Sequence, residues 1–516
     1  MDRETVTDVV VVGGGPVGLA ASLELSRQGV RHVLLERHAG TSVFPKARLI
    51  TTRSMELLRS WGLQEEVERT GLPRGESLAL CIAETLTSPR FRREEARVQA
   101  DAPQSPTYGV ICSQDLLEVV LRRAAEASPL ADVRFGTRAG EVRDVDGGVE
   151  LDLDGGGCVR ARYAVAADGS RSPVRTARGI GVDGPPPLSH MVSVMVSAPI
   201  GPLVADRPSA LYFVRNAEVQ CAVEAVDGTD RWMLQLAYRP DRGEGPGDFT
   251  DAVCTAAVRA AVGVADLPVR VLGVMPWTQQ AVVARTFRSG RVLLAGDAAH
   301  VATPQGGFGM NCGIADVGNL GWKLAAVLRG DAPDGLLDTY HDERHPVATW
   351  TARESLRNAE ITRDMMTGAL SPAEAGDLQA LRRRAEGMVL GCAYASAAVL
   401  DDGTPAPAPD YEHYRPTARP GHRAPHAWLP DGSSVLDSFG PGFTLVVPAG
   451  SPAAAPPGTG RVELPPAAAA AYGIPAGGGL LVRPDGHVAW RSSDAYGASV
   501  ALAAVLGRSE VATAAA

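Results

Sequence analysis

The sequence predicts an α/β protein that combines a parallel sheet with helices, an inserted antiparallel sheet and a separate C-terminal domain. Three observations lead to this prediction. Short apolar strands at 7–12 and 292–294 each run into a glycine-rich turn and then a helical pattern. Short alternating segments separated by turns fill 191–239, which is typical of an antiparallel sheet. Residues 401–460 are rich in Pro, Gly and Ala and mark a domain boundary.

Length and composition exclude several classes of protein. A chain of 516 residues is too long for one ordinary core and indicates two or three domains. The net charge of −9 argues against a nucleic-acid partner, which would favour a basic face. No apolar run reaches the length of about 18 residues that a membrane helix needs, and the acidic start is no secretory signal. We therefore expect a cytoplasmic protein without a membrane partner.

The cysteines give no sign of a disulfide framework or a metal site. All seven are scattered, no C-x-x-C occurs, and none clusters with histidines at ligand spacing. We expect reduced thiols and no bound metal. Cys312 is interpreted as a small buried residue rather than a redox nucleophile.

The first strand ends in a G-x-G-x-x-G pattern at Gly13, Gly15 and Gly18, which opens a helix over 19–28. One glycine allows the tight turn, one allows close approach of a pyrophosphate, and one allows the helix to pack on the strand. The next strand, 33–35, ends in Glu36, which stands 18 residues after Gly18. An acid about 20 residues beyond the glycines binds a ribose 2′-hydroxyl, so the pattern predicts an adenine dinucleotide, either FAD or NAD.

A second glycine-rich segment lies at 291–311. The strand 292–294 is followed by Gly296-Asp297, then by glycines at 306, 307 and 309, and a helix opens near Gly309. Free N–H groups at a helix start carry partial positive charge, which favours a negatively charged ligand group. Glycines there let a flat ligand lie directly on the backbone.

A third segment, 161–175, predicts a buried strand followed by the turn Asp168-Gly169. Together, the three motifs in this order resemble the single-component, class A flavoprotein monooxygenases of the p-hydroxybenzoate hydroxylase fold. The resemblance covers most of the chain and implies FAD in a Rossmann-like domain.

The resemblance implies a set of residues around the cofactor. The glycine loop would hold the pyrophosphate, Gln114 and Gly296-Asp297 the ribityl chain, and the helix start the flavin ring, flanked by Pro304 and Gly307. Lys46 stands where many relatives have arginine, so that contact could pass to Arg48 or Arg53. The expected cofactor-binding residues are Gly13, Gly15, Pro16, Val17, Gly18, Glu36, Arg37, Lys46, Arg48, Gln114, Asp168, Gly296, Asp297, Gly309, Met310 and Asn311.

The inserted sheet would face the flavin ring and form the wall of a substrate site. The candidate wall residues are Met195, Tyr212, Phe213, Trp232 and Met233. Because side chains alternate along a strand, half of any such set faces away from the site.

The predicted domains follow from these assignments. The FAD-binding domain comprises 1–74, 107–182 and 285–398, and the substrate-binding domain 75–106 and 183–284. The strands at 133–153 would form a small antiparallel layer in the first, and Pro346 would break a helix. Residues 399–516 resemble the thioredoxin-like C-terminal domain of phenol hydroxylase and the aromatic polyketide hydroxylases. Because no C-x-x-C is present, we expect no thiol redox chemistry there and a structural or homodimer role instead.

The resemblance also implies the reaction. NADPH or NADH would reduce FAD, dioxygen would form a C4a-hydroperoxide, and a phenolic or polyketide-like substrate of secondary metabolism, such as antibiotic biosynthesis, would be hydroxylated. No catalytic side chain is assignable, and His300 is interpreted as a structural hydrogen-bonding residue. Two alternatives stay open: Baeyer–Villiger insertion or ring cleavage by the same flavin chemistry, and a protein that sequesters a small molecule.

Overall fold

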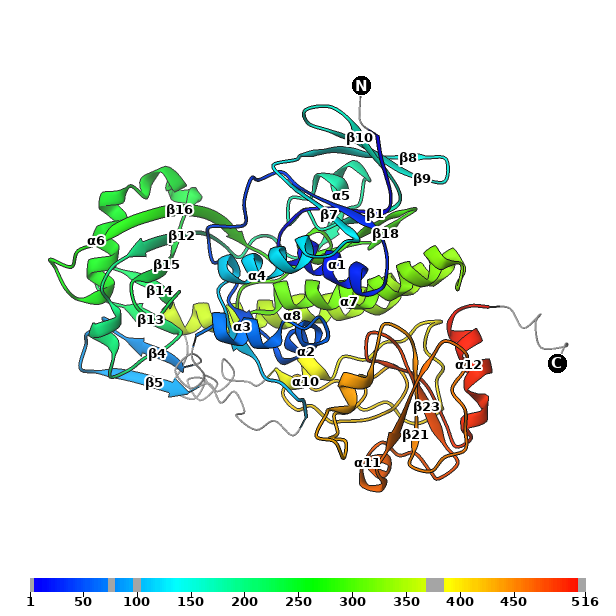
Figure 1. The fold of residues 1–516 in the computed structure, drawn as a ribbon. Helices are drawn as coiled ribbons and strands as arrows, with labels where there is room; N and C mark the ends of the chain where they lie inside the picture. The colour runs from blue at the N-terminus through cyan, green and yellow to red at the C-terminus, as the bar shows by residue number, and fades with distance from the viewer. Residues whose placement is uncertain (1–3, 73–78, 96–103, 368–384, 509–516) are drawn as a thin grey trace.

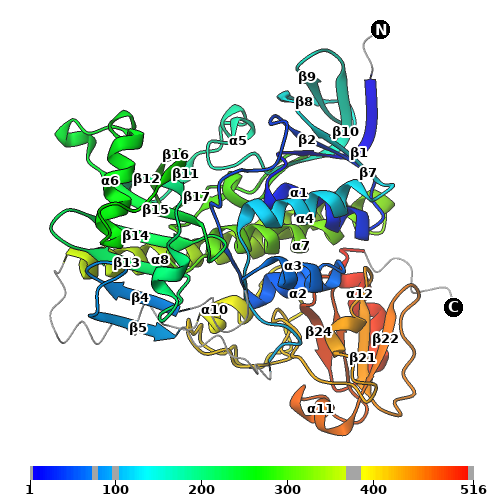
Figure 2. The same cartoon turned by 60° about the vertical axis from the view of Figure 1, so that its left-hand side comes forward.

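The structure, a computed structural model, describes residues 4–72, 79–95, 104–367 and 385–508. These residues form a parallel sheet with helices, a second large sheet beside it, and a C-terminal unit (Figure 1). The long helices α7 (Phe308–Arg329) and α8 (Asp338–Thr367) run through the middle of the molecule in both views (Figures 1 and 2). The expected boundary between 74 and 75 lies outside the described residues. None of the described helices has the length and apolarity to cross a membrane.

The main sheet has the strand order β18-β19-β10-β1-β2-β7. Its central strands pair in parallel, and their apolar side chains are buried on both faces, as Val9 to Val11 show. The strands are β1 (Glu4–Val12), β2 (His32–Glu36), β7 (Ala131–Phe135), β10 (Cys158–Ala166), β18 (Arg288–Ser289) and β19 (Val292–Leu294). Val12 lies beside Leu35 and Ala166, so the glycine loop and the ends of β2 and β10 meet at one edge.

The expected antiparallel layer at 133–153 is wrong for its first strand, because β7 pairs in parallel with β2. Helix α4 (Gln114–Glu126) precedes β7 and returns the chain across the sheet, which is the connection that parallel strands need. Strands β8 (Ala139–Val145) and β9 (Gly148–Leu153) pair antiparallel, and β9 also pairs antiparallel with β10.

Glycines bring the helices behind this sheet close together. A Cβ at Gly18 of α1 (Pro16–Arg27) would lie 1.8 Å from the carbonyl oxygen of Gly13, and one at Gly321 of α7 would lie 2.4 Å from Cγ of Glu24. Any larger residue would push the elements apart. Helix α7 therefore packs directly on α1, and its N-terminus reaches the edge where the strands end.

The second sheet has the order β16-β12-β15-β14-β13-β4-β5 and is antiparallel except where β13 meets β4. Its strands are β4 (Ala79–Ala83), β5 (Phe91–Glu95), β12 (Ser189–Ser197), β13 (Leu211–Arg215), β14 (Gln220–Ala225), β15 (Arg231–Tyr238) and β16 (Arg270–Gln279). Helix α6 (Asp251–Val262) covers one face, where Val194, Val223 and Leu234 pack with Cys254 and Val258. The opposite face is left open toward the main sheet.

Short elements connect these sheets and support the loops between them. Strands β11 (Val182–Asp183), β17 (Val282–Ala284) and β20 (His300–Val301) form one small sheet, and β3 (Leu49–Ile50) pairs with β6 (Val110–Ile111). Helices α2 (Thr52–Ser60) and α3 (Gln64–Thr70) follow β3, and α5 (Pro173–Ala177) follows β10.

The C-terminal unit has a four-stranded sheet of order β22-β21-β23-β24. Strands β21 (Thr444–Pro448) and β22 (Gly460–Leu464) are parallel, whereas β23 (Gly479–Val482) and β24 (Val488–Ser492) run antiparallel. Helices α11 (Pro466–Ala471) and α12 (Ala498–Val505) belong to this unit, and α10 (Glu386–Leu390) precedes it. Its own apolar core includes Val446, Leu464, Tyr472, Leu480 and Val488.

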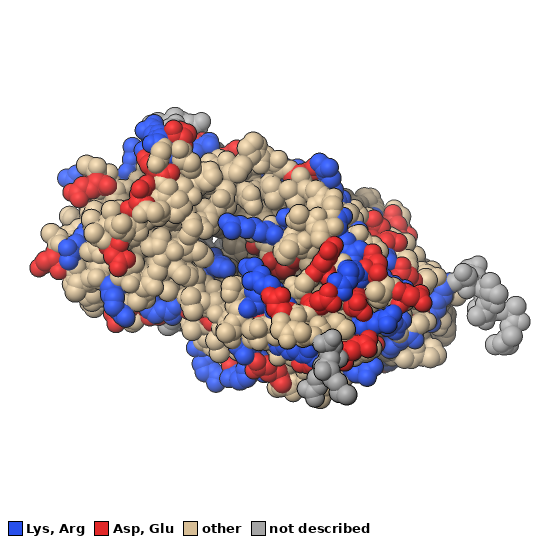
Figure 3. Space-filling model, turned by 90° about the horizontal axis from the view of Figure 1, so that it is seen from above, with Lys and Arg blue, Asp and Glu red and all other residues tan. Residues whose placement is uncertain are grey.

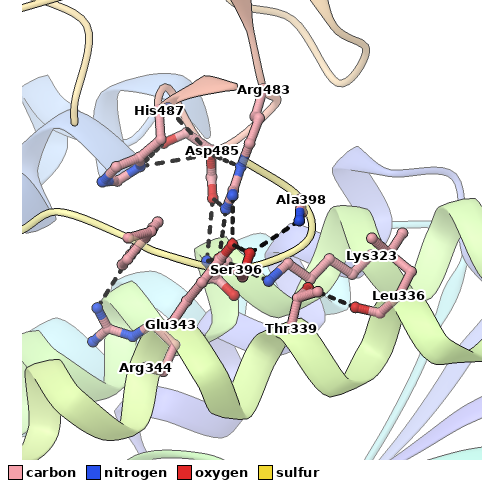
Figure 4. Close-up of polar contacts among 12 residues, drawn as sticks. Lys323, Leu336, Thr339, Glu343, Arg344, Ser396, Ala398, Arg483, Asp485 and His487 are labelled. Carbon is pink, nitrogen blue, oxygen red and sulfur yellow. Dashed lines mark hydrogen bonds and ion pairs between the residues drawn. The ribbon is translucent and has the colours of Figure 1, made fainter. Parts of the chain in front are cut away.

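A buried ionic network joins this unit to α7 and α8 (Figure 4). The two nitrogens of the Arg483 guanidinium donate to Glu343 at 2.7 and 2.8 Å, and Lys323 Nζ donates to the same carboxylate at 2.8 Å. Arg483 also pairs with Asp485 at 2.5 Å. All four side chains are almost fully buried, so their partners are fixed.

The expected break at Pro346 is wrong, because α8 continues through it from Asp338 to Thr367. The helix is held by buried contacts on both sides of the proline. Glu343 and Arg344 make ion pairs before it, and Ser355 accepts the Thr303 N–H after it. These contacts offset the backbone hydrogen bond that proline removes.

Candidate active site

A cavity of about 2200 Å3 lies between the ends of the parallel strands, the start of α7 and the open face of the second sheet. Seen from above, the surface is hollowed near the middle of the molecule, and side chains of both charges gather around the hollow (Figure 3). The cavity lining includes both basic and acidic residues, so the site is polar at its rim without a single dominant charge.

The glycine loop forms one end of the cavity. Gly13, Gly15, Pro16 and Val17 line it. A Cβ at Gly15 would meet no protein atom within 4 Å, so this position faces open space. Gly18 does not line the cavity, and its role is the close packing of α1 on the loop.

Glu36 lies at the end of β2 beside this loop. Its carboxylate accepts hydrogen bonds from the backbone N–H of Gly14 at 2.7 Å and of His38 at 2.8 Å. Arg37 also lines the cavity, and its Nε lies 3.1 Å from Nε2 of His38. Glu36 is therefore held beside the glycine loop, and it lines the cavity.

Two aspartates stand along the middle of the cavity. Oδ2 of Asp168 accepts from the Val174 N–H at 3.1 Å, whereas its buried Oδ1 has no hydrogen-bond donor among the described residues. Asp297, after β19, is open to the cavity. The surrounding protein raises the pKa of both carboxyls through desolvation. Gly296 does not line the cavity; its N–H donates to Asp316.

The start of α7 forms the cavity floor. Pro304, Gly307, Gly309 and Met310 line it, and a Cβ at Gly309 would meet no protein atom within 4 Å. Asn311, which was expected at the cofactor as part of this helix start, does not line the cavity. The Asn311 side chain accepts from the Thr51 N–H and donates to the carbonyls of Leu49 and Gly307, which ties two loops to the helix.

The three basic residues of the 46–53 segment point to different places. Lys46 faces the cavity. Arg48 lines it too, but its guanidinium pairs with Glu224 at 2.8 Å and donates to the carbonyls of Ala210 and Ala225, so it is engaged by the second sheet. Arg53 pairs with Glu56 and donates to Asp485, toward the C-terminal unit. Among the described residues, Lys46 is the member of this set that lines the cavity without a side-chain hydrogen bond, and its charge lowers the pKa of Glu118 and Asp297 against the effect of burial.

Gln114 lies at the start of α4 and lines the cavity. Its Nε2 donates to Glu118 at 2.6 Å, and the other oxygen of Glu118 accepts from the Ser42 N–H at 2.6 Å. Burial raises the pKa of Glu118. The Gln114 amide is therefore held at the cavity edge by Glu118 of the same helix. Glu118 is itself held by the loop that carries Ser42.

Of the five predicted wall residues, only Phe213 lines the cavity. Tyr212 and Trp232 lie on the opposite face, in the core under α6, with ring centroids 6.1 Å apart. Met195 and Met233 are buried beyond the cavity lining. The wall residues that were missed are Met191, Ser193, Leu211, Ala222, Glu224, Gln235, Ala237, Met275, Trp277 and Gln279.

Polar residues within the strands indicate in the sequence which face of this sheet lines the cavity. Ser193, Glu224 and Gln235 are polar residues inside otherwise apolar strands. Since a buried polar side chain needs a partner, such residues mark the face that is open to a site. Alternate positions counted from these three residues include Met191, Ala222 and Ala237, which also line the cavity.

His300 and Cys312 lie behind the loop that carries Asp297, in a buried cluster. His300 Nε2 contacts Asp316 at 2.6 Å, and Arg344 donates to Asp316 at 2.8 Å and approaches Cys312 Sγ at 3.3 Å. His300, Cys312 and Asp316 are close enough to suggest metal ligands, but Arg344 donates to Asp316 and Cys312, and His300 Nε2 is bonded to Asp316. The cluster is a hydrogen-bonding support of the loop, as expected for His300.

Comparison with known proteins decides the family. Residues 6–355 match the family of the FAD binding domain, and residues 417–509 match the aromatic-ring hydroxylase C-terminal domain. The chain belongs to the FAD-dependent aromatic-ring hydroxylases. The resemblance expected from the three motifs is thus confirmed.

The hydroxylase is 37% identical over 541 residues to tetracenomycin B2 monooxygenase-dioxygenase of Streptomyces olivaceus, covering 95% of this chain and 96% of the relative. It is 36% identical over 528 residues to aklavinone 12-hydroxylase of Streptomyces purpurascens, with coverage of 95% and 96%. The solved ternary complex of aklavinone-11 hydroxylase with FAD and aklavinone matches with a TM-score of 0.87 and 34% identity, over 98% of this chain and 100% of that one. The enzyme is a flavoprotein monooxygenase.

The site of this hydroxylase fits FAD on its own geometry. Asp168 has a buried acceptor oxygen that lacks a donor, which a ligand hydroxyl would satisfy. Gly15 and Gly309 leave open the space that any side chain would fill. Gly15, Asp168 and Gly309 all line the same cavity.

Proposed function

We propose that this hydroxylase uses NADPH or NADH to place one oxygen atom on an aromatic, polyketide-like molecule of secondary metabolism. The observation that carries the proposal is the continuous cavity between the glycine loop and the second sheet. Its volume of about 2200 Å3 exceeds the ~300–1,000 Å3 of an ordinary ligand pocket, so it has room for a dinucleotide and a multi-ring substrate. Hydroxylases of aklavinone and other polyketides among the relatives support this substrate class.

In this proposal the cofactor residues act in sequence along the cavity. The Gly13–Gly18 loop binds the pyrophosphate, Glu36 the adenosine ribose, and Asp168, Asp297 and Gln114 the ribityl chain. Lys46 supplies a positive charge near the phosphates. The roles rest on the places of these residues in the cavity lining.

When bound and reduced by a nicotinamide donor, FAD supplies the electrons and the dioxygen activation for the oxygen transfer. The chain binds, orients and shields the reactants. The free backbone N–H groups at the start of α7, at Gly309 and Met310, would stabilise negative charge on the ring of a bound flavin. The apolar part of the wall, including Phe213 and Met275, holds the substrate opposite Pro304 and Gly307 and excludes water.

We also propose the division into a discontinuous FAD-binding domain, a substrate-binding domain and a thioredoxin-like C-terminal domain. The strand order β22-β21-β23-β24, with one parallel and two antiparallel pairs, supports the last assignment. The sequence of the C-terminal domain contains no C-x-x-C motif. Its role in this proposal is structural.

The test is turnover with purified protein, FAD and NADPH or NADH under air, with a panel of phenols and polycyclic aromatics. We expect substrate-stimulated oxidation of the nicotinamide and a product that gains one oxygen with its rings intact. A lactone or an opened ring would favour oxygen insertion instead. A protein that binds a panel compound but cannot be reconstituted with FAD would indicate sequestration.

A further inference from the structure

The open face of the second sheet carries a chain of polar side chains across an otherwise apolar wall. Arg48 pairs with Oε2 of Glu224 at 2.8 Å, and Oε1 of Glu224 accepts from Nε2 of Gln235 at 3.3 Å. Oε1 of Gln235 in turn accepts from Ser193 at 2.7 Å and from Trp277 Nε1 at 3.3 Å. All five side chains line the cavity or lie directly on its wall.

The direction of every hydrogen bond in this chain is determined by the chemistry of its ends. The arginine guanidinium and the tryptophan N–H can only donate. Trp277 therefore requires the oxygen of the Gln235 amide on its side, which places the amide nitrogen toward Glu224. The other amide orientation would put two donors together at Trp277 and two acceptors together at Glu224.

This fixed order leaves two groups for a ligand. Both lone pairs of the Gln235 oxygen are taken, and one of its two N–H groups donates to Glu224. The second N–H of Gln235 has no acceptor among the described residues. Each oxygen of Glu224 also keeps a lone pair, because Arg48 and Gln235 each take one. A donor and an anionic acceptor thus stand side by side at the cavity.

The surroundings of this pair favour a flat aromatic ligand. Leu211, Phe213, Ala222, Ala237 and Met275 line the same wall. Such a surface covers rings, whereas the polar pair contacts one edge of them.

We propose that Gln235 and Glu224 select substrates that carry a carbonyl and a hydroxyl next to each other on one ring edge, such as hydroxyquinones and hydroxyaryl ketones. The Gln235 N–H donates to the carbonyl, and Glu224 accepts from the hydroxyl. The inference deepens the proposed function, on which it rests, by naming the substrate feature that is recognised. An analogue without the hydroxyl leaves a half-buried carboxylate lone pair without its donor and is rejected.

The experiment measures binding of 1-hydroxyanthraquinone and of unsubstituted anthraquinone to the FAD-loaded, oxidised enzyme by equilibrium dialysis. The first compound has one hydroxyl beside a ring carbonyl, and the second has carbonyls alone. We expect 1-hydroxyanthraquinone to bind roughly tenfold more tightly, the effect of a hydrogen bond to a charged group. Equal affinities in the wild type would overturn the proposal.

Two variants separate recognition from folding. Glu224→Leu removes the acceptor of the hydroxyl and should reduce the preference for 1-hydroxyanthraquinone to about twofold or less, with anthraquinone binding nearly unchanged. Gln235→Leu removes the donor to the carbonyl that both ligands carry, so it should weaken the binding of both about equally. A Glu224→Leu enzyme that retains FAD and still prefers 1-hydroxyanthraquinone tenfold would refute the assignment. Because binding needs no turnover, failed hydroxylation with intact discrimination would count against the proposed function alone.

Discussion

At the scale of single residues, two glycines of one loop have different structural roles. Gly18 is needed because a side chain would strike the carbonyl of Gly13 at 1.8 Å, inside the protein. Gly15 has ordinary backbone angles, φ −74° and ψ −174°, and open space before it. Gly18 therefore maintains packing, whereas Gly15 keeps room for a ligand.

This difference predicts the behaviour of Gly15→Ala. The variant should fold with a thermal midpoint close to that of the wild type, because the new methyl group meets no protein atom. FAD affinity should fall about 10- to 100-fold, equivalent to the ~1–3 kcal/mol cost of overpacking. Fluorescence titration of the apoprotein measures it. Gly440→Ala, at another glycine with no atom within 4 Å, is the matched control and should change neither quantity.

Neighbouring residues of one strand offer a second residue-scale test. Phe213 lines the cavity, whereas Tyr212 is packed with Trp232 on the far face. Phe213→Ala should mainly raise KM for the aromatic substrate. Tyr212→Ala should lower the free energy of unfolding by about 3–5 kcal/mol, as other large core truncations do, with KM retained if it folds. Denaturant unfolding and steady-state kinetics distinguish them, and the reverse pattern would place the wall on the other face.

At the scale of elements, Asp316 joins α7, α8 and the loop after β19. It accepts from the Gly296 N–H at 3.0 Å, from His300 at 2.6 Å and from Arg344 of α8 at 2.8 Å. Burial alone would raise its pKa, but His300 and Arg344 hold the pKa of Asp316 at about 2. A single carboxylate thereby fixes the loop that carries Asp297.

We expect Asp316→Asn to destabilise the protein by about 3–5 kcal/mol, because Arg344 would remain buried without its counterion. FAD should also dissociate faster from the loosened loop. Denaturant unfolding and the rate of FAD release into excess apoprotein report these effects. Asp183→Asn, in an exposed pair with Arg285 at 2.9 Å, should cost less than about 0.5 kcal/mol and leave FAD release unchanged. Equal effects of both variants would contradict the assigned role.

At the scale of the whole molecule, buried ion pairs dock the C-terminal unit onto the FAD-binding part. One is the network of Glu343, Lys323 and Arg483, and the other joins Glu56 of α2 to Arg423. Burial alone would raise the pKa of Glu56, but Arg423 and Arg53 hold it at about 2. The docking is therefore sensitive to acid.

The sign of this dependence follows from the lowered pKa. The ionised Glu56 contributes stability that is present above pH ~4.5 and is lost as the pH falls toward 2. Its loss in Glu56→Gln should reduce the free energy of unfolding by roughly 3 kcal/mol at pH 6. The difference from wild type should shrink to less than half of that by about pH 3. Glu126→Gln, in the exposed pair with Arg122, is the control and should show no such trend. A difference independent of pH would mean that Glu56 acts through packing alone.

The sequence by itself determined the family, the cofactor and the parallel sheet with its three turns. Those features are local: a glycine spacing, a strand that ends in Glu36, and a helix that begins next to Gly309 are complete within a few tens of residues. The tertiary structure alone decided which strand face meets the cavity, that Arg48 pairs with Glu224, and that Arg483 meets Glu343, which lies 140 residues away. It also decided that Pro346 stays within a helix. Periodicity shows that a strand has two faces, but only the element packed against it, here α6, determines which face is buried.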